Sequence, residues 1–101
     1  MQFVVIARDG TDREAPERRL AIRPAHLDAI RSYVDHGNIA VGGAILDASD
    51  AMVGSVLLVE FPTREALDGW LAADPYVTAG VWRDVEVHPF RAAVGTWLPA
   101  S

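Results

Sequence analysis

Two segments of this chain are apolar at every position, not only at every second one. Residues 3–6 read FVVI and residues 56–59 read VLLV. Successive side chains of a strand point to opposite faces of its sheet, so each segment places hydrophobic side chains on both faces. A strand of this kind belongs in the interior of a sheet that is covered on both sides. The two segments therefore predict two central strands.

Hydrophobic spacing and turn residues predict the elements around these strands. The Asp9-Gly10 turn signal ends the first strand. Residues 11–19 are charged and aperiodic, which predicts a loop, either without regular structure or with one helical turn. The predicted elements are strands at 3–8, 38–45, 53–61 and 81–90, a helix at 24–36, and a second helix from its N-cap Thr63 to about Ala73. The order β-α-β-β-α-β is typical of an α+β, ferredoxin-like fold with an antiparallel sheet.

This arrangement leaves one apolar face of the sheet without helices. Right-handed crossovers place both helices on the same face, so the other face needs a different cover. Another subunit, a ligand or the C-terminal tail at 91–101 would supply it. We expect a homodimer formed through sheet faces as the most economical solution.

The last predicted strand, residues 81–90, alternates between two kinds of side chain. Val81, Val85 and Val87 are expected on one face, and Pro89 places the strand at an edge of the sheet. The side chains expected on the opposite face are Trp82, Asp84, Glu86 and His88.

Composition narrows the range of functions. We expect residues 1–101 to form a single domain in the cytoplasm without a membrane span, because no apolar run is long enough and no basic leader is present. The chain has no cysteine, nine arginines, no lysine and a net charge of −5. Its only basic cluster is Arg18, Arg19 and Arg23, so we expect no nucleic-acid partner. The pattern favours solvated loop charge for this cluster over contact with an anionic small molecule.

One histidine and one aspartate stand beside prolines at two predicted helix boundaries. His26 lies in RPAHLDAI at 23–30, and Asp74 lies in ADPYVTAG at 73–80. Proline suits the first helical position, so Pro24 places His26 in a first turn, where the helix dipole favours a neutral, proton-accepting ring. Asp74 either caps a short turn that starts at Pro75 or partners a base. Together the two side chains are candidates for acid/base chemistry.

The remaining polar and aromatic residues give weaker signals. His36 suits a helix C-terminus, and His88 is a candidate contact to a dimer partner. The histidine spacing matches no metal motif, so neither a metal nor another cofactor is predicted. Trp70 has core spacing with its neighbours in the second helix. The three aromatic residues left for a pocket or for ordinary packing are Tyr76, Trp82 and Trp97.

Four segments in order carry a resemblance to a known family. They are RLAIRPAHL at 19–27, VGSVLLVEF at 53–61, DPYVTAG at 74–80 and VEVHPF at 85–90. With these motifs the chain resembles the YciI-like (YCII-related) family. The resemblance implies a dimeric α+β barrel fold with His26 and Asp74 as the active-site pair. It also implies substrate-positioning roles for Arg23, Ser55 and Tyr76.

The resemblance leaves the substrate open. One branch of the family is similar to enzymes that dehydrochlorinate hydroxylated aromatics, and the same fold houses lactone isomerases and cofactor-free monooxygenases. This chain has an additional tail, AAVGTWLPAS, whose Trp97 either closes over the site or covers the dimer edge.

Three hypotheses about function follow. The first is a small cofactor-independent enzyme for elimination, isomerisation or tautomerisation of a small aromatic or acidic molecule. In it His26 is the general acid/base, Asp74 orients it, and Arg23 attracts negative charge. The second is a non-catalytic dimer that binds a small ligand. The third is a purely structural role for His26 and Asp74.

Overall fold

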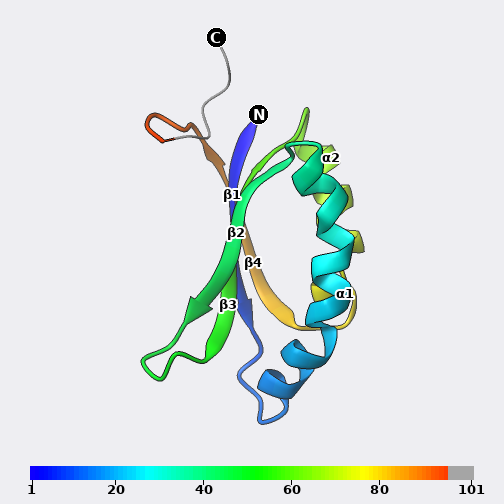
Figure 1. The fold of residues 1–101 in the computed structure, drawn as a ribbon, viewed down its shortest axis with the longest axis vertical. Coiled ribbons are helices and arrows are strands. Elements are labelled where there is room, and N and C mark those ends of the chain that lie inside the picture. The colour runs from blue at the N-terminus through cyan, green and yellow to red at the C-terminus, as the bar shows by residue number, and fades with distance from the viewer. Residues whose placement is uncertain (96–101) are drawn as a thin grey trace.

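A computed structural model of the chain describes residues 1–95, which form a four-stranded antiparallel sheet with helices on one face (Figure 1). The elements are β1 (Gln2–Asp9), α1 (Ala15–Asp35), β2 (Ile39–Leu46), β3 (Met52–Glu60), α2 (Arg64–Ala73), α3 (Pro75–Thr78) and β4 (Trp82–Phe90). The strand order is β2-β3-β1-β4. This confirms the predicted ferredoxin-like fold of the α+β class and the central places of β1 and β3.

The core lies between the sheet and the helices. Alternate residues of β1 and β3 point into it, and α2 contributes Leu67 and Trp70, as its hydrophobic spacing predicts. The N-cap of α2 is also as expected, because the Thr63 hydroxyl accepts from the Ala66 N–H at 3.1 Å. The buried hydrophobic side chains are Phe3, Val5, Ala7, Ile39, Leu57, Val59, Phe61, Leu67, Trp70, Tyr76, Val81 and Trp82.

Helix α1 begins at Ala15, nine residues before the predicted start. The expected loop at 11–19 is therefore wrong for its second half. Pro16 occupies the first turn, where proline costs no hydrogen bond, whereas Pro24 lies inside the helix. Pro24 has no N–H to donate to the carbonyl of Leu20, one turn earlier. Both residues lie on the exposed side of α1. There the loss of one helical hydrogen bond costs little.

Strand β4 contains a bulge that changes its expected alternation. Arg8 of β1 pairs with Asp84, but Asp9 pairs with Trp82, so the register shifts by one residue. The shift turns Trp82 toward the helices, and its side chain is buried. The prediction that Trp82 shares a face with Asp84 is therefore wrong.

No element of residues 1–95 covers the second face of the sheet, as Figure 1 shows. Large apolar side chains remain exposed there, including Val41 at 58% and Phe90 at 40%. They surround the partly buried Leu58. None of the helices in the described residues combines the length and apolar character that a membrane crossing needs.

Candidate functional site

His26 and Asp74 meet in the buried layer between α1 and the short helix α3. His26 Nδ1 lies 2.8 Å from Asp74 Oδ1, and the two residues are only 6% and 3% exposed. An ionised carboxylate beside Nδ1 selects the tautomer in which Nδ1 carries the proton and donates it. The other ring nitrogen, Nε2, then has a free lone pair and no hydrogen-bond partner among residues 1–95. The pair thus presents an oriented proton acceptor.

Asp74 also caps α3. The same Oδ1 atom accepts from the Tyr76 backbone N–H at 2.8 Å, and Pro75 fills the first position of the helix. The predicted cap is therefore confirmed. The same oxygen contacts the His26 ring, and the role of Asp74 as the partner of a base stays a prediction. Its Oδ2 atom is buried and has no hydrogen-bond partner in the described part of the chain.

His26 does not occupy a first turn, which corrects the dipole argument. It lies in the middle of α1, eleven residues after Ala15, so the field of the helix N-terminus has faded there. The Asp74 carboxylate takes the place of that field as the main electrostatic neighbour of the ring.

An aromatic wall fixes the plane of the His26 ring. The Tyr76 ring stacks on it with centroids 3.9 Å apart and planes inclined by 9°. The Trp82 indole meets it edge-on at 5.5 Å. Burial raises the pKa of the Tyr76 hydroxyl, and the positive charges of Arg19 and Arg23 oppose that rise only in part. The Tyr76 hydroxyl is therefore a neutral donor at physiological pH.

Arg19 is a buried residue of the site, not a solvated loop charge. Its Nη1 donates to both Asp9 carboxylate oxygens, at 2.9 and 3.0 Å, and its Nη2 donates to Ser55 Oγ at 2.9 Å. The Trp82 indole N–H donates to the same Ser55 oxygen at 3.2 Å. The guanidinium carbon lies 5.0 Å from the centre of the Tyr76 ring. Ser55 accepts twice, so its own hydrogen remains available to a ligand.

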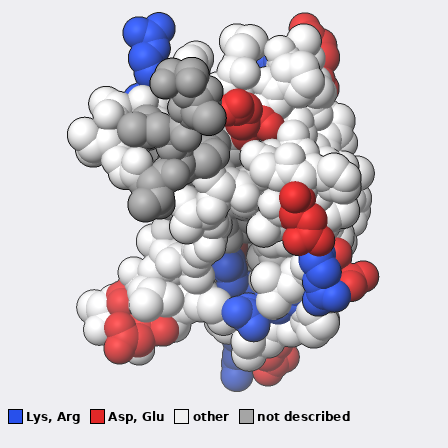
Figure 2. All heavy atoms as spheres, turned by 45° about the horizontal axis from the view of Figure 1, so that its top comes forward, with Lys and Arg blue, Asp and Glu red and all other residues white. Residues whose placement is uncertain are grey.

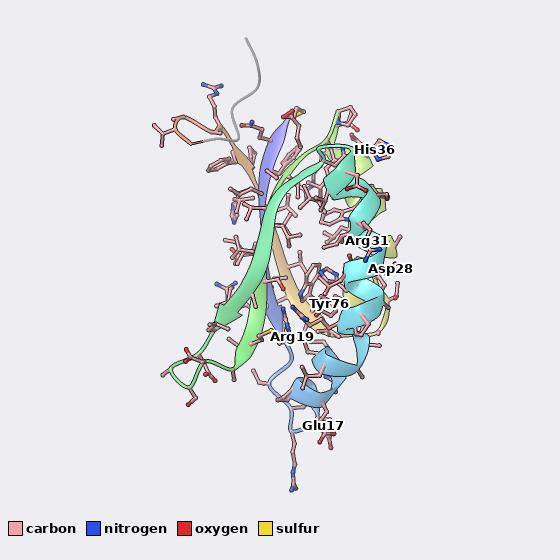
Figure 3. All side chains as sticks on the ribbon, in the orientation of Figure 1. Glu17, Arg19, Asp28, Arg31, His36 and Tyr76 are labelled. Atoms are coloured by element: carbon pink, nitrogen blue, oxygen red, sulfur yellow. The ribbon has the colours of Figure 1, made fainter. Side chains whose placement is uncertain are left out.

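These side chains line a cavity of about 120 Å³ between α1 and the strands β2 and β3. Figure 3 shows Arg19 and Tyr76 in the layer between α1 and the sheet, whereas Asp28 and Arg31 lie on the outer side of the helix. In Figure 2 arginine side chains gather at the hollow beside the helices. The residues that line the cavity are Arg19, Arg23, His26, Leu27, Ile30, Gly42, Gly43, Ala44, Met52, Ser55, Leu57 and Tyr76.

Small residues of β2 keep the cavity open. A Cβ atom on Gly42 would lie 3.2 Å from the Leu57 side chain, and one on Gly43 would meet nothing within 4 Å. A side chain at Gly42 would therefore crowd Leu57, another residue that lines the cavity.

Comparison with known proteins places this chain in a family. Residues 1–91 match the YCII-related domain family. The chain belongs to this family. Protein YciI of Escherichia coli O6:H1 is 38% identical over 97 residues, covering 90% of this chain and 97% of the relative.

Two solved structures resemble this YCII-related chain. A 5-chloro-2-hydroxyhydroquinone dehydrochlorinase (TftG) from Burkholderia phenoliruptrix, in complex with 2,5-dihydroxybenzoquinone, superposes with a TM-score of 0.83. It is 23% identical, and the match covers 92% of this chain and 96% of that one. A dimeric ferredoxin-like protein from Jannaschia gives a TM-score of 0.52 at 14% identity, over 90% and 98% of the two chains. These similarities show a shared fold.

The structure brings together all five site residues predicted from the sequence of this YCII-related protein. Four line the cavity, and Asp74 lies behind His26. Arg19 and Asp9 were not predicted for the site, and Trp82 was predicted either for a pocket or for ordinary packing. The available signal was the spacing of Arg19, Arg23 and His26, which repeats at i, i+4 and i+7 and places all three on one helix face.

The other two histidines lie apart from the site. His36 Nδ1 is 2.6 Å from the Ser32 carbonyl oxygen, as suits the end of α1, and His88 Nε2 is 3.3 Å from Glu86. Within residues 1–95 no three potential ligand side chains cluster as a metal site. Trp97, which the sequence offers as a lid or an edge cover, lies outside the described residues.

Proposed function

We propose that this YCII-related protein is a cofactor-independent enzyme that moves a proton on a small acidic or aromatic molecule bound in the cavity. The observation that carries the proposal is the His26–Asp74 pair, with Nδ1 tied to the carboxylate and Nε2 available at the cavity wall. A base held in this way acts without a metal or an organic cofactor in elimination and tautomerisation.

Each site residue has a separate role in this proposal. His26 Nε2 accepts the proton, and Asp74 holds the ring and stabilises it once it is protonated. Arg23 lies exposed on the cavity wall and attracts negative charge on the substrate. The hydroxyl hydrogens of Ser55 and Tyr76 are donors to substrate oxygens.

The resemblance to the dehydrochlorinase supplies a test reaction. In 5-chloro-2-hydroxyhydroquinone, two hydroxyl protons are lost, the ring carbon that bears chlorine gains a proton, and chloride departs. The product is hydroxybenzoquinone, a net loss of HCl that needs no external oxidant. We expect the protein to release chloride from this compound faster than buffer does, measured with a chloride electrode. Binding of the compound without chloride release would favour the alternative, a non-catalytic ligand-binding protein.

We also propose that the protein is a homodimer formed through the open sheet face. The support is the row of exposed apolar side chains on that face and the dimeric state named for the Jannaschia protein. Sedimentation at micromolar concentration should give twice the 10.9 kDa chain mass. High salt should not dissociate the dimer, because salt screens charge pairs but not hydrophobic burial.

A charged substitution separates this interface from other surfaces. Val56→Asp places a carboxylate in the open face and should give monomers. Leu20→Asp, on the exposed side of α1, should leave the dimer intact. A folded wild-type monomer, or dissociation by Leu20→Asp alone, would contradict the proposed interface.

A further inference from the structure

Arg19 is a buried cation whose hydrogen bonds are incomplete. A guanidinium has five N–H groups. Nη1 donates to both Asp9 oxygens, and Nη2 donates to Ser55 Oγ. The Nε–H is buried without a partner among residues 1–95. This side chain is therefore held firmly, and it forms part of the wall of the cavity.

Stability alone does not account for the Arg19–Asp9 pair. The two side chains are only 4% and 5% exposed, so both charges lose their hydration. A well-packed apolar pair of similar volume is often as stable as a buried ion pair, or more so. Within the pair, the Asp9 carboxylate offsets the charge of Arg19. It also holds the guanidinium in place by accepting hydrogen bonds from Nη1. The cost of burying this pair favours a functional role for the cation.

The polar groups of the cavity are nearly all donors. Arg19, Arg23, Ser55 and Tyr76 present N–H or O–H groups, whereas His26 Nε2 is the acceptor that the tautomer leaves free. A ligand complementary to these groups carries several acceptor oxygens and one acidic hydrogen. Negative charge on those oxygens strengthens the hydrogen bonds from the arginines.

The Tyr76 ring connects the two ends of this arrangement. Its face contacts the His26 imidazole at 3.9 Å, and the Arg19 guanidinium lies 5.0 Å from its centre. Imidazole and guanidinium are therefore close enough for one small planar molecule to meet both. The hydrogen-bonded chain from Asp9 through Arg19 to Ser55 gives the guanidinium end a fixed position.

We propose that Arg19, positioned by Asp9, is a specificity-determining residue that selects small molecules with an anionic oxygen, of the enolate, phenolate or carboxylate class. The inference deepens the proposed function, on which it rests, by naming the substrate class. Arg19 holds the anionic oxygen at one end of the ligand while His26 faces the acidic hydrogen at the other.

The test compares an anionic and a neutral ligand of related shape. The probes are 2,5-dihydroxybenzoquinone, whose hydroxyl groups are ionised at neutral pH, and hydroquinone, which is neutral there. Calorimetry measures the affinity of each for the wild type and for three variants. Because Arg19→Gln alone would strand the Asp9 charge, the first variant is Asp9→Asn/Arg19→Gln, which removes both charges. Arg19→Lys is the second, and Arg31→Gln on the outer side of α1 is the matched control.

The double variant should bind dihydroxybenzoquinone roughly 10-fold to 100-fold more weakly, the effect of one charged hydrogen bond, with hydroquinone affinity unchanged. Arg19→Lys keeps the positive charge but loses the planar set of guanidinium donors. We therefore expect an intermediate loss of affinity for dihydroxybenzoquinone. If circular dichroism shows that the double variant is unfolded, the affinities of Arg19→Lys for the two probes decide whether Arg19 selects the anionic ligand. Arg31→Gln should change neither affinity.

Equal losses for both probes, or a wild type without preference for the anion, would overturn this inference. The proposed function fails on a different observation, which is unchanged chloride release when His26 is replaced.

Discussion

His26→Gln is expected to lower the rate of chloride release by roughly 10²–10⁴, the usual effect of losing a general acid/base. Glutamine fills most of the space beside Tyr76 and still offers an N–H to the buried Asp74, but it has no basic nitrogen. The comparison is kcat for the wild type and the variant with 5-chloro-2-hydroxyhydroquinone. His36→Gln, at the exposed end of α1, removes a histidine remote from the cavity and should retain wild-type turnover.

The choice of glutamine follows from the packing of the ring. His26 stacks on Tyr76 and lies almost fully buried. Alanine would leave a cavity and an unpaired carboxylate, and each of these destabilises a folded chain. A His26→Gln protein that is folded and still turns over at the wild-type rate would exclude His26 as the base.

Asp74→Ala and Asp74→Asn should affect stability differently and turnover alike. Asparagine caps helices as well as aspartate does, so Asp74→Asn should retain most of the free energy of unfolding. Asp74→Ala should lose about 1 kcal/mol more through the missing cap at Tyr76 N–H. Both variants should be strongly impaired in turnover, because neither supplies the charge that stabilises a protonated His26 ring.

Urea denaturation and chloride release measure these two properties separately. Thr63→Ala is the control, since it removes the cap of α2 without touching the cavity and should cost about 1 kcal/mol while retaining activity. If Asp74→Asn turns over normally, Asp74 is only a cap.

The sequence predicts best where one local signal has one structural outcome. The two-sided apolar segments become the central strands β1 and β3, and Thr63 caps α2 as its position indicates. Asp74 before Pro75 is equally local, so the cap of α3 is predictable. Its contact with His26 spans 48 residues of sequence. The local sequence made the two residues candidates for acid/base chemistry, and the family resemblance implied that they form one active-site pair.

The sequence-based predictions were wrong where a segment can adopt two local structures and tertiary packing decides between them. Pro16 and Pro24 both suit a helix start, and burial of Arg19 on the face that also carries His26 favours the longer helix. Because residues 11–19 read as a loop, Arg19 appeared to be a solvated charge. The β4 bulge that turns Trp82 inward has no local signature in the alternating pattern. The longer helix places Arg19 in the cavity wall, and the bulge places Trp82 against His26 and Ser55.

The state of the His26 nitrogens tests the central claim most directly. Long-range ¹H–¹⁵N NMR spectra distinguish a protonated from an unprotonated ring nitrogen. In the free protein Nδ1 should carry the proton, because it faces the Asp74 carboxylate at 2.8 Å, and Nε2 should be bare. Addition of 2,5-dihydroxybenzoquinone should shift the Nε2 resonance. Tight binding of this ligand with both nitrogen resonances unchanged, or a free protein with the proton on Nε2, would contradict the account.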